Sequence, residues 1–335
     1  MKKSRSKLNV LILILITLLV LYFSLKDDFH NIVDQIMNIN VWLLFLAFIM
    51  VIIYWFLRSK AVSVFTKKFS PKTTYWSSLQ MMLRTQFFNA VTPFATGGQP
   101  YQVYHLIKDG ISATTSTSVI IQNFIVYQIA MILLGCIAVV LNQIFGVFAR
   151  SSILRQLVTL GFIINTAVIV VLFIVAFSTK MNKKLVRLGI TILTKLKLVK
   201  DKEKKLKEWD EYINNFHESA EILLENKWHF ILTILYNLIA LCCLYSIPYI
   251  LLCATGDFTS FDLPTAIMTS AYVMLIGSFV PIPGGSGGLE YGFVSFYGTF
   301  ITGSTLMAIM LLWRFVTYYF GMIVGAIALN MKKVD

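Results

Sequence analysis

Long apolar runs separated by short polar and basic stretches dominate the hydrophobic pattern of this chain. Several of these runs, such as residues 41–57, contain no charged side chain at all. Because about 20 apolar residues in a helix cross the hydrocarbon core of a bilayer, such runs predict transmembrane helices. We expect six of them, at residues 8–25, 41–57, 119–141, 157–177, 229–252 and 305–329. The fold class that follows is an all-α polytopic membrane protein built as a helical bundle.

The first run follows the basic tail MKKSRSK and could be mistaken for a secretory signal. It is longer than the apolar core of a usual signal peptide, and no small-x-small cleavage motif precedes Lys26. We therefore expect an uncleaved first span.

Two further apolar stretches, residues 75–110 and 266–301, are interrupted by Pro and Gly, and they decide the topology. Basic residues concentrate in the amino-terminal tail, in residues 58–74, in residues 178–228 and at the carboxyl terminus. The positive-inside tendency makes all four regions cytoplasmic, so both termini are expected in the cytoplasm of a cell-membrane protein. Counting crossings between these regions then makes each interrupted stretch a re-entrant hairpin, one from each face.

The two interrupted stretches share a spacing of residues. Pro93-x3-Gly97-Gly98-x2-Tyr101 in the first matches Pro283-x3-Gly287-Gly288-x2-Tyr291 in the second. Opposed hairpins with matching motifs indicate an inverted-topology repeat, an architecture common in secondary transporters.

The segment 178–228 contains twelve Lys and Arg against eight acids, with apolar residues at loosely helical spacing. This pattern predicts one or two cytoplasmic amphipathic helices. They could contact anionic lipid headgroups or a separate lipid-modifying enzyme. The plainer alternative is a solvated helical hairpin packed on the bundle.

Composition and charge narrow the class of protein. Of the 335 residues 57% are apolar and only 13% are charged, which excludes a water-soluble globular protein. The net charge of +13 is typical of basic cytoplasmic loops, and no nucleic-acid motif accompanies it. The four cysteines and four histidines show no metal, redox or catalytic spacing. No nucleotide-binding motif is present, so we expect no cofactor, no metal and no catalytic residue.

Both hairpin tips are candidates for a central site. Irregular backbone at membrane depth is tolerated only where it lines a cavity or is buried in protein. A half-helix can begin after each tip and direct its free N–H groups toward an anion. The candidates for backbone binding of a lipid phosphate are Gly97, Gly98, Gly287 and Gly288. Alternatively, these glycines only permit a tight turn and close helix packing.

Three charges fall in or beside membrane-depth segments: Arg84, Glu290 and Arg314. A charge at that depth is costly unless it is paired or hydrated. Two Arg against one Glu leave room for one negative charge, which a lipid phosphate would supply through the planar guanidinium fork. The alternatives are an internal Arg–Glu pair and, for Glu290, the favourable position of an acid in the first turn of a helix.

Polar residues around these charges predict a hydrated path. A helix with so many polar positions cannot face acyl chains and must face protein or water. The cavity-lining candidates are Gln80, Gln86, Asn89, Thr92, Glu290, Tyr101, Tyr291 and Tyr318.

Three segments together resemble a known family, the membrane-embedded flippase-type region of bacterial lysylphosphatidylglycerol synthases, also called multiple peptide resistance factor, and its stand-alone relatives. They are Arg84-x3-Phe88-Asn89-x3-Pro93-x3-Gly97-Gly98-x-Pro100, then Pro281-x-Pro283-Gly284-Gly285-x-Gly287-Gly288-x-Glu290, and Trp313-Arg314.

The resemblance implies translocation of an aminoacylated or otherwise modified phospholipid between leaflets, with resistance to cationic antimicrobial peptides as its consequence. The soluble lysyltransferase domain of the full-length enzymes is absent from this sequence, so we expect a translocase rather than an enzyme. A membrane subunit of a lipid-modifying enzyme and a small-anion channel or exchanger stay open as alternatives. The sequence also leaves the lipid headgroup and a homo-oligomeric state open.

Overall fold

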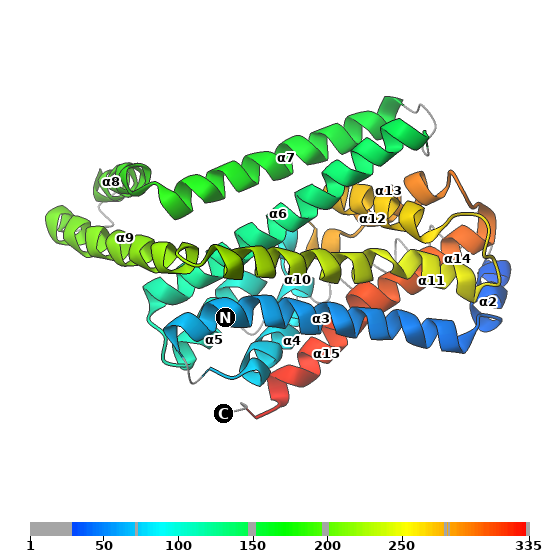
Figure 1. The fold of residues 1–335 in the computed structure, drawn as a ribbon, viewed down its shortest axis with the longest axis horizontal. Coiled ribbons are helices and arrows are strands. Elements are labelled where there is room, and N and C mark those ends of the chain that lie inside the picture. The colour runs from blue at the N-terminus through cyan, green and yellow to red at the C-terminus, as the bar shows by residue number, and fades with distance from the viewer. Residues whose placement is uncertain are drawn as a thin grey trace.

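The computed structural model describes residues 29–70, 73–146, 152–195, 201–277, 280 and 282–332. Every regular element within those ranges is a helix (Figure 1). Five stretches are long and apolar enough to cross a membrane: Val41–Phe69, Ala113–Phe145, Val158–Val175, Lys227–Ala254 and Gly303–Asn330. The prediction of an all-α polytopic membrane protein is therefore confirmed. The predicted span at residues 8–25 lies outside the described residues.

The chain folds as two helical sets joined by an apolar helix and an amphipathic helix pair. The first set consists of α2 (Phe29–Met37), α3 (Val41–Phe69), α4 (Tyr75–Val91), the short turn η1 (Pro93–Ala95), α5 (Gly98–Lys108) and α6 (Ala113–Phe145). The connecting part consists of α7 (Ser152–Phe177), α8 (Thr179–Lys195) and α9 (Lys202–Leu224). The second set consists of α10 (Lys227–Tyr245), α11 (Ile247–Ala254), α12 (Leu263–Gly277), η2 (Pro283–Gly285), α13 (Gly288–Tyr297), α14 (Gly303–Arg314), the π-helical turn η3 (Phe315–Tyr319) and α15 (Phe320–Asn330).

Side-chain caps fix where the long helices begin. The Asn40 side-chain oxygen accepts from the backbone N–H groups of Trp42 and Leu43 at the start of α3. Ser112 and Asn226 cap α6 and α10 in the same way. Each cap satisfies backbone donors that have no partner in the first turn of a helix.

Helix α3 continues beyond the span that the sequence predicts at residues 41–57. Its 29 residues reach Phe69, so Arg58 lies within the helix rather than in a loop. The residues that follow at helical spacing, Ala61, Val62 and Phe65, are buried. The helix therefore continues because one face of its second half still packs against protein.

The two interrupted stretches form helix–turn–helix units of matching design. In the first, α4 is followed by η1 and α5; in the second, α12 is followed by η2 and α13. The turn η2 starts 190 residues after η1 (Pro93 and Pro283), and α14 starts 190 residues after α6 (Ala113 and Gly303). The second helix of each unit has only 11 or 10 residues. At about 1.5 Å per residue, neither reaches across a hydrocarbon core of about 30 Å.

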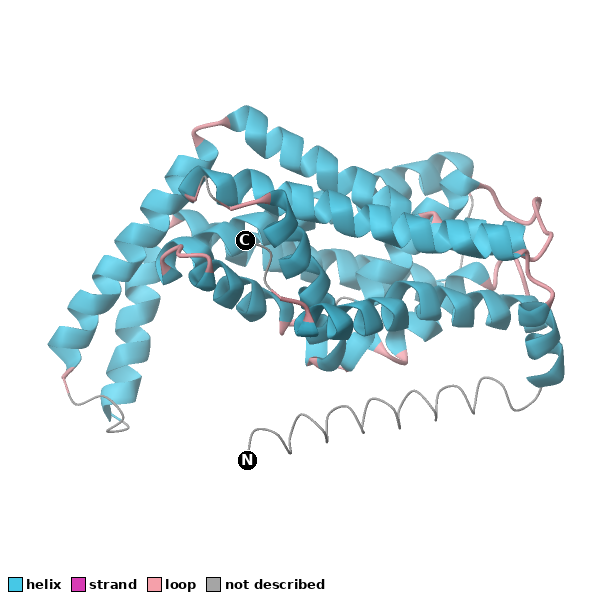
Figure 2. Cartoon of the chain, turned by 90° about the horizontal axis from the view of Figure 1, so that it is seen from below, coloured by secondary structure: helices cyan, strands magenta, loops and turns pink. Residues whose placement is uncertain are grey.

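The two units lie toward opposite ends of the bundle. Figure 1 shows α4 and α5 toward the end that carries α8 and α9, whereas α12 and α13 lie toward the end that carries α2. Their turns, η1 and η2, contact each other in the middle of the molecule. The α8–α9 pair projects from one end, as Figure 2 shows at its left.

The apolar core is divided in two. The larger cluster joins α3, α6 and the helices of the second set and includes Trp55, Tyr245, Phe293 and Trp313. The smaller cluster joins the end of α3 to α4, α5 and the start of α6, with Phe65 among its members. The region between the tips, where these clusters meet, contains the candidate site.

Candidate functional site

A cavity of about 790 Å³, here the central cavity, lies between the two turns and the surrounding helices. This volume is within the range of about 300–1,000 Å³ typical of small-molecule sites. Helices α3, α4, α6 and α7 line it together with both turns and with the junction of α14 and η3. Among the described residues that line it are two arginines, Arg58 and Arg314, and no aspartate or glutamate.

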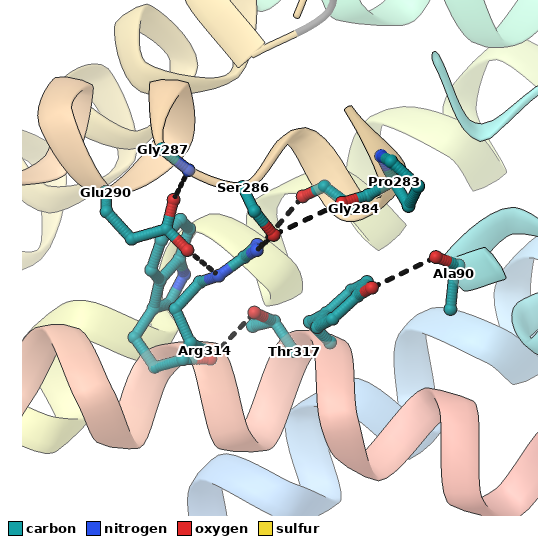
Figure 3. Close-up of polar contacts among 10 residues, drawn as sticks. Ala90, Pro283, Gly284, Ser286, Gly287, Glu290, Arg314 and Thr317 are labelled. Carbon is teal, nitrogen blue, oxygen red and sulfur yellow. Dashed lines mark hydrogen bonds and ion pairs between the residues drawn. The ribbon is translucent and has the colours of Figure 1, made fainter. Parts of the chain in front are cut away.

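Arg314 is held by the second tip, residues 282–288, in the contacts that Figure 3 draws. Its Nε lies 2.7 Å from Glu290 Oε1, and its Nη2 donates to the Gly284 carbonyl at 3.0 Å and to Ser286 Oγ at 3.3 Å. The other Glu290 oxygen accepts from the Gly287 backbone N–H at 2.7 Å. With only 4% of the arginine exposed, this is a buried ion pair that fastens the second tip to the last span.

Tyr318 extends this cluster toward the first unit. Its ring lies 4.6 Å from the Arg314 guanidinium carbon, a cation–π distance, and its hydroxyl donates to the Ala90 carbonyl at 3.0 Å. The π-helical turn Phe315–Tyr319 follows Arg314 directly, and such turns occur often at functional sites. The end of α4, the second tip and the last span are thus connected through two side chains.

The side chains of Arg84 and Gln80 lie outside the central cavity, at the C-terminal end of α15. Arg84 donates from Nε to the Ala328 carbonyl at 2.9 Å and from Nη2 to the Met331 carbonyl at 2.7 Å. Gln80 donates to the Lys332 carbonyl at 2.6 Å. These contacts satisfy backbone acceptors at the C-terminal end of α15, where a cation is favourable. Neither side chain is among those that line the central cavity.

The remaining predicted residues divide into two groups. Those that line the central cavity are Gln86, Asn89 and Tyr318, in addition to Arg314. Those that lie around the tips without lining it are Thr92, Gly97, Gly98, Tyr101, Gly287, Gly288, Glu290 and Tyr291. Thr92 accepts from the Gly97 backbone N–H at 2.8 Å, and Tyr291 is exposed.

Close packing explains three of the four paired glycines after the turns, and the fourth, Gly287, has a φ of 85° that favours glycine. A Cβ at Gly98 would collide with Asn89, and one at Gly288 would collide with Val280. A Cβ at Gly97 would lie 2.6 Å from a Thr92 side-chain carbon. These positions need glycine for the approach of neighbouring elements, which favours the structural interpretation of the glycine motif over direct anion binding.

Arg58 is the residue that sequence reasoning missed. From α3 its guanidinium lies over the Tyr127 ring, 3.9 Å from the ring centroid, and Nη1 donates to Asn237 Oδ1 at 2.6 Å. Nε is buried and has no hydrogen-bond partner. Burial at helical spacing after Arg58 could have revealed it, because the apolar stripe of α3 continues past this charge.

A second missed group lies at the base of the first unit. The Ser77 hydroxyl donates to Asp109 Oδ2 at 2.7 Å, and its oxygen lies 3.2 Å from His105 Nε2. The i,i+4 spacing of His105 and Asp109 on one helix was visible in the sequence. The Ser77 hydroxyl donates to the Asp109 carboxylate, and none of the three side chains lines the cavity. We therefore interpret the three as a contact that joins α4 to α5, not as a catalytic nucleophile and its base. In the part of the chain that the structure describes, no three His, Cys, Asp or Glu gather as metal ligands.

Comparisons with known proteins agree with the resemblance in the sequence. A UPF0104 membrane protein of Archaeoglobus fulgidus is 22% identical over 331 residues, which cover 98% of this chain and 97% of that protein. An uncharacterized protein of Mycoplasma genitalium is 26% identical over 182 residues, 51% of this chain and 45% of that one. The family model of the lysylphosphatidylglycerol synthase TM region matches residues 10–325. The chain therefore belongs to the lysylphosphatidylglycerol synthase TM region family.

Proposed function

We propose that this protein moves the headgroup of a membrane lipid across the bilayer through the central cavity. The observation that carries the proposal is the cavity itself, because it lies between two broken helical units and is lined by two arginines without a lining acid. The lipid-related family supports the choice of a lipid as cargo. The headgroup would pass along the polar side chains that line the cavity, such as Arg58, Asn89 and Asn123, while the acyl chains stay in the bilayer.

In this proposal the two helix–turn–helix units are re-entrant hairpins related by an inverted repeat. Three observations support it: the short second helices, the constant offset between corresponding elements and the contact between η1 and η2. Transporters with such repeats bind their substrates near the midplane, where the repeats meet. Movement of one hairpin relative to the other would open the cavity to one leaflet at a time.

The orientation we propose follows from the basic residues. The end that carries α8, α9 and the end of α15 faces the cytoplasm of a cell membrane, because its segments contain most of the Lys and Arg. The loop between α11 and α12 then faces outward.

We further propose that α8 contacts anionic lipid at the cytoplasmic surface. It carries five basic residues, Lys180, Lys183, Lys184, Arg187 and Lys195, and no acid. Its apolar residues Leu185, Leu188 and Ile192 are exposed, while its other side packs on α9. Basic amphipathic helices of this kind bind headgroups of anionic lipids. Docking of a separate lipid-modifying enzyme on α8, or a helix that stays solvated beside the bundle and binds no lipid, would be the contrary result.

The proposal assigns no chemical step to this chain. Purified protein incubated with phosphatidylglycerol and lysyl-tRNA should form no lysyl-lipid, and any such product would overturn this part of the proposal. Thin-layer separation of radiolabelled lipid measures it directly.

Reconstituted vesicles test the transport. A phospholipid with a fluorescent headgroup label is placed in both leaflets, and added dithionite bleaches only the outer leaflet. We expect the protein to make the inner pool accessible. Thr317→Trp, which places a bulky side chain in the cavity, should slow this access strongly, whereas Ile239→Trp, at an exposed position of α10, should not. Anion flux without lipid exchange in the same vesicles would instead identify a channel.

A further inference from the structure

The charge balance of the central cavity is unequal. Of the two arginines that line it, Arg314 is neutralised by Glu290. Arg58 has no carboxylate within 4.0 Å among the described residues and takes part in no ion pair there. The cavity therefore contains one cation that no described side chain compensates.

The contacts of Arg58 with the described residues leave one edge of its guanidinium without hydrogen bonds. Nη1 is occupied by Asn237, and the Tyr127 ring covers one face of the guanidinium plane. Nε is buried and has no partner, so the hydrogen bonds of the edge formed by Nε and Nη2 are not satisfied within the part of the protein that the structure describes. That edge is the fork with which arginine binds two oxygens of a phosphate or carboxylate. A buried, charged N–H group without an acceptor is unfavourable, so an anion at this edge would satisfy it.

Two amide side chains that line the same cavity also have oxygens without a hydrogen-bond partner among the described residues. Asn123 lies one helical turn before Tyr127 on α6, is only 2% exposed and has an unpartnered Oδ1. Asn89, on α4, likewise has an unpartnered Oδ1. Both line the cavity. Neutral amides of this kind bind hydroxyl groups of a ligand without adding charge.

We propose that Arg58 binds the phosphate of a headgroup that carries hydroxyl groups and no net positive charge, such as a glycerol phosphodiester. This inference rests on the proposed function and names its cargo. The phosphate oxygens meet the free guanidinium edge, and the hydroxyls meet Asn123 and Asn89. A lysyl ester on the same headgroup would bring ammonium groups into a cavity that has an unpaired cation and no lining carboxylate, where like charges repel strongly. The cavity thus selects the unmodified anionic lipid over its aminoacylated form.

A purely structural Arg58 makes a different prediction. The stacking on Tyr127 and the bond to Asn237 would then be its whole role, and substitution would lower stability without changing which headgroup binds. A test must therefore read out headgroup preference as well as affinity.

Short-chain lipids below their micelle concentration allow this measurement on purified protein by titration calorimetry. The probes are dihexanoyl phosphatidylglycerol, its lysyl ester, dihexanoyl phosphatidylcholine and inorganic phosphate. We expect phosphatidylglycerol to bind most tightly. Arg58→Gln should weaken its binding about 10- to 100-fold, as loss of a charged bidentate contact does, and should remove its advantage over the lysyl ester. Arg58→Lys keeps the charge without the fork and should show a smaller loss.

Lys60→Gln is the matched control, because it removes one positive charge from an exposed position on the same helix. It should leave all affinities unchanged. If Arg58→Gln fails to fold, the comparison between Arg58→Lys and the parent decides. Tighter binding of the lysyl ester than of phosphatidylglycerol, or unchanged preference in the Arg58 variants, would overturn the inference even if lipid translocation is observed. Binding of inorganic phosphate without binding of phosphatidylglycerol would assign the site to a free anion and overturn the lipid assignment.

This result is separable from the transport assay. Phosphatidylglycerol binding that depends on Arg58, without exchange between leaflets, would refute translocation and leave the binding site intact. Translocation at an unchanged rate and with unchanged headgroup preference in the Arg58 variants would support the transport function and refute the binding role of Arg58.

Discussion

The two tips have nearly the same backbone but different residues. In the first tip, residues 92–98, Phe94 and Ala95 adopt φ values of 54° and 52°. In the second, Gly284 and Gly285 adopt 66° and 64° at the corresponding positions. Residues other than glycine are rarely found in this left-handed region, at a cost of about 1–2 kcal/mol each. The first tip therefore contains strain that the second avoids.

The tips also differ in how they are held. The ion pair of Arg314 and Glu290 fastens the second tip. The offset that relates Pro93 to Pro283 places Phe124 and Pro100 at the corresponding positions of the first unit, so no such pair can form there. The same backbone turn is thus anchored by an ion pair in the second tip and contains unfavourable backbone angles in the first tip. This difference makes the first tip the easier of the two to displace.

Removal of the ion pair should have the largest effect. Arg314→Gln leaves the Glu290 carboxylate buried without its partner, and loss of one member of a buried pair destabilises a protein by about 3–5 kcal/mol. The free energy of unfolding in detergent, measured by thermal and denaturant melts, should fall by that amount. Combining Arg314→Gln with Glu290→Gln should restore most of it. A stable single variant would refute the anchoring role of the pair.

Exchange of the tip residues should have the next largest effect. Gly284→Ala introduces a Cβ at positive φ that would collide with the Tyr318 ring, so we expect a loss of about 2–4 kcal/mol. Ala95→Gly relieves strain in the first tip but frees the unfolded chain, and it should change stability by less than about 1 kcal/mol. Equal losses in both variants would mean that the two tips are held alike.

The sequence predicts the crossing helices well because bilayer thickness imposes their length. It predicts their ends less well: Arg58 reads as the start of a cytoplasmic loop, yet α3 carries this charge into a cavity that accommodates it. Pro93 and Pro283 locate the two turns correctly, since proline and glycine cannot continue a regular helix there. No local pattern reveals that the turns touch each other.

The candidate site is less predictable because helical spacing does not say which face of a helix meets a cavity. Arg84 is on a polar helix, yet its partners are carbonyls at the end of α15, far away in sequence. For Arg314 the sequence left an ion pair and a phosphate contact open, and the structure contains the pair with Glu290. Such long-range pairings depend on packing, which single-sequence periodicity does not contain.

Arg84 gives a smaller test of the first unit. Arg84→Gln removes two charge-assisted hydrogen bonds to the end of α15, one of them exposed, and should cost about 1–2 kcal/mol of unfolding free energy. Headgroup binding should not change, because the side chain does not line the cavity. A calorimetric titration with dihexanoyl phosphatidylglycerol checks this, and weakened binding would place Arg84 in the site after all.

Acid should loosen the second unit slightly and leave the first unaffected. In the loop before α12, hydrogen bonds from Ser260 and Thr259 lower the pKa of Asp257 to about 2 from its ordinary value of 3.8. At the start of α12 itself, hydrogen bonds from the Thr265 side chain and backbone N–H lower the pKa of the Asp262 carboxyl as well. The start of α4 is capped instead by the uncharged hydroxyl of Thr74. Because folding favours the ionised form of Asp257, its stabilisation is present above about pH 4 and disappears as the pH falls toward 2. The loop is largely solvated, so the effect should stay under about 1 kcal/mol. Hydrogen–deuterium exchange, corrected for the intrinsic pH dependence of exchange, should show reduced protection of residues 257–265 at pH 3 relative to pH 5, with no change at residues 74–78. Asp257→Asn should weaken the pH dependence of the first segment, and its combination with Asp262→Asn should remove it, because the pKa of Asp262 is lowered as well. Equal loosening of both segments would contradict the assignment to these carboxylates.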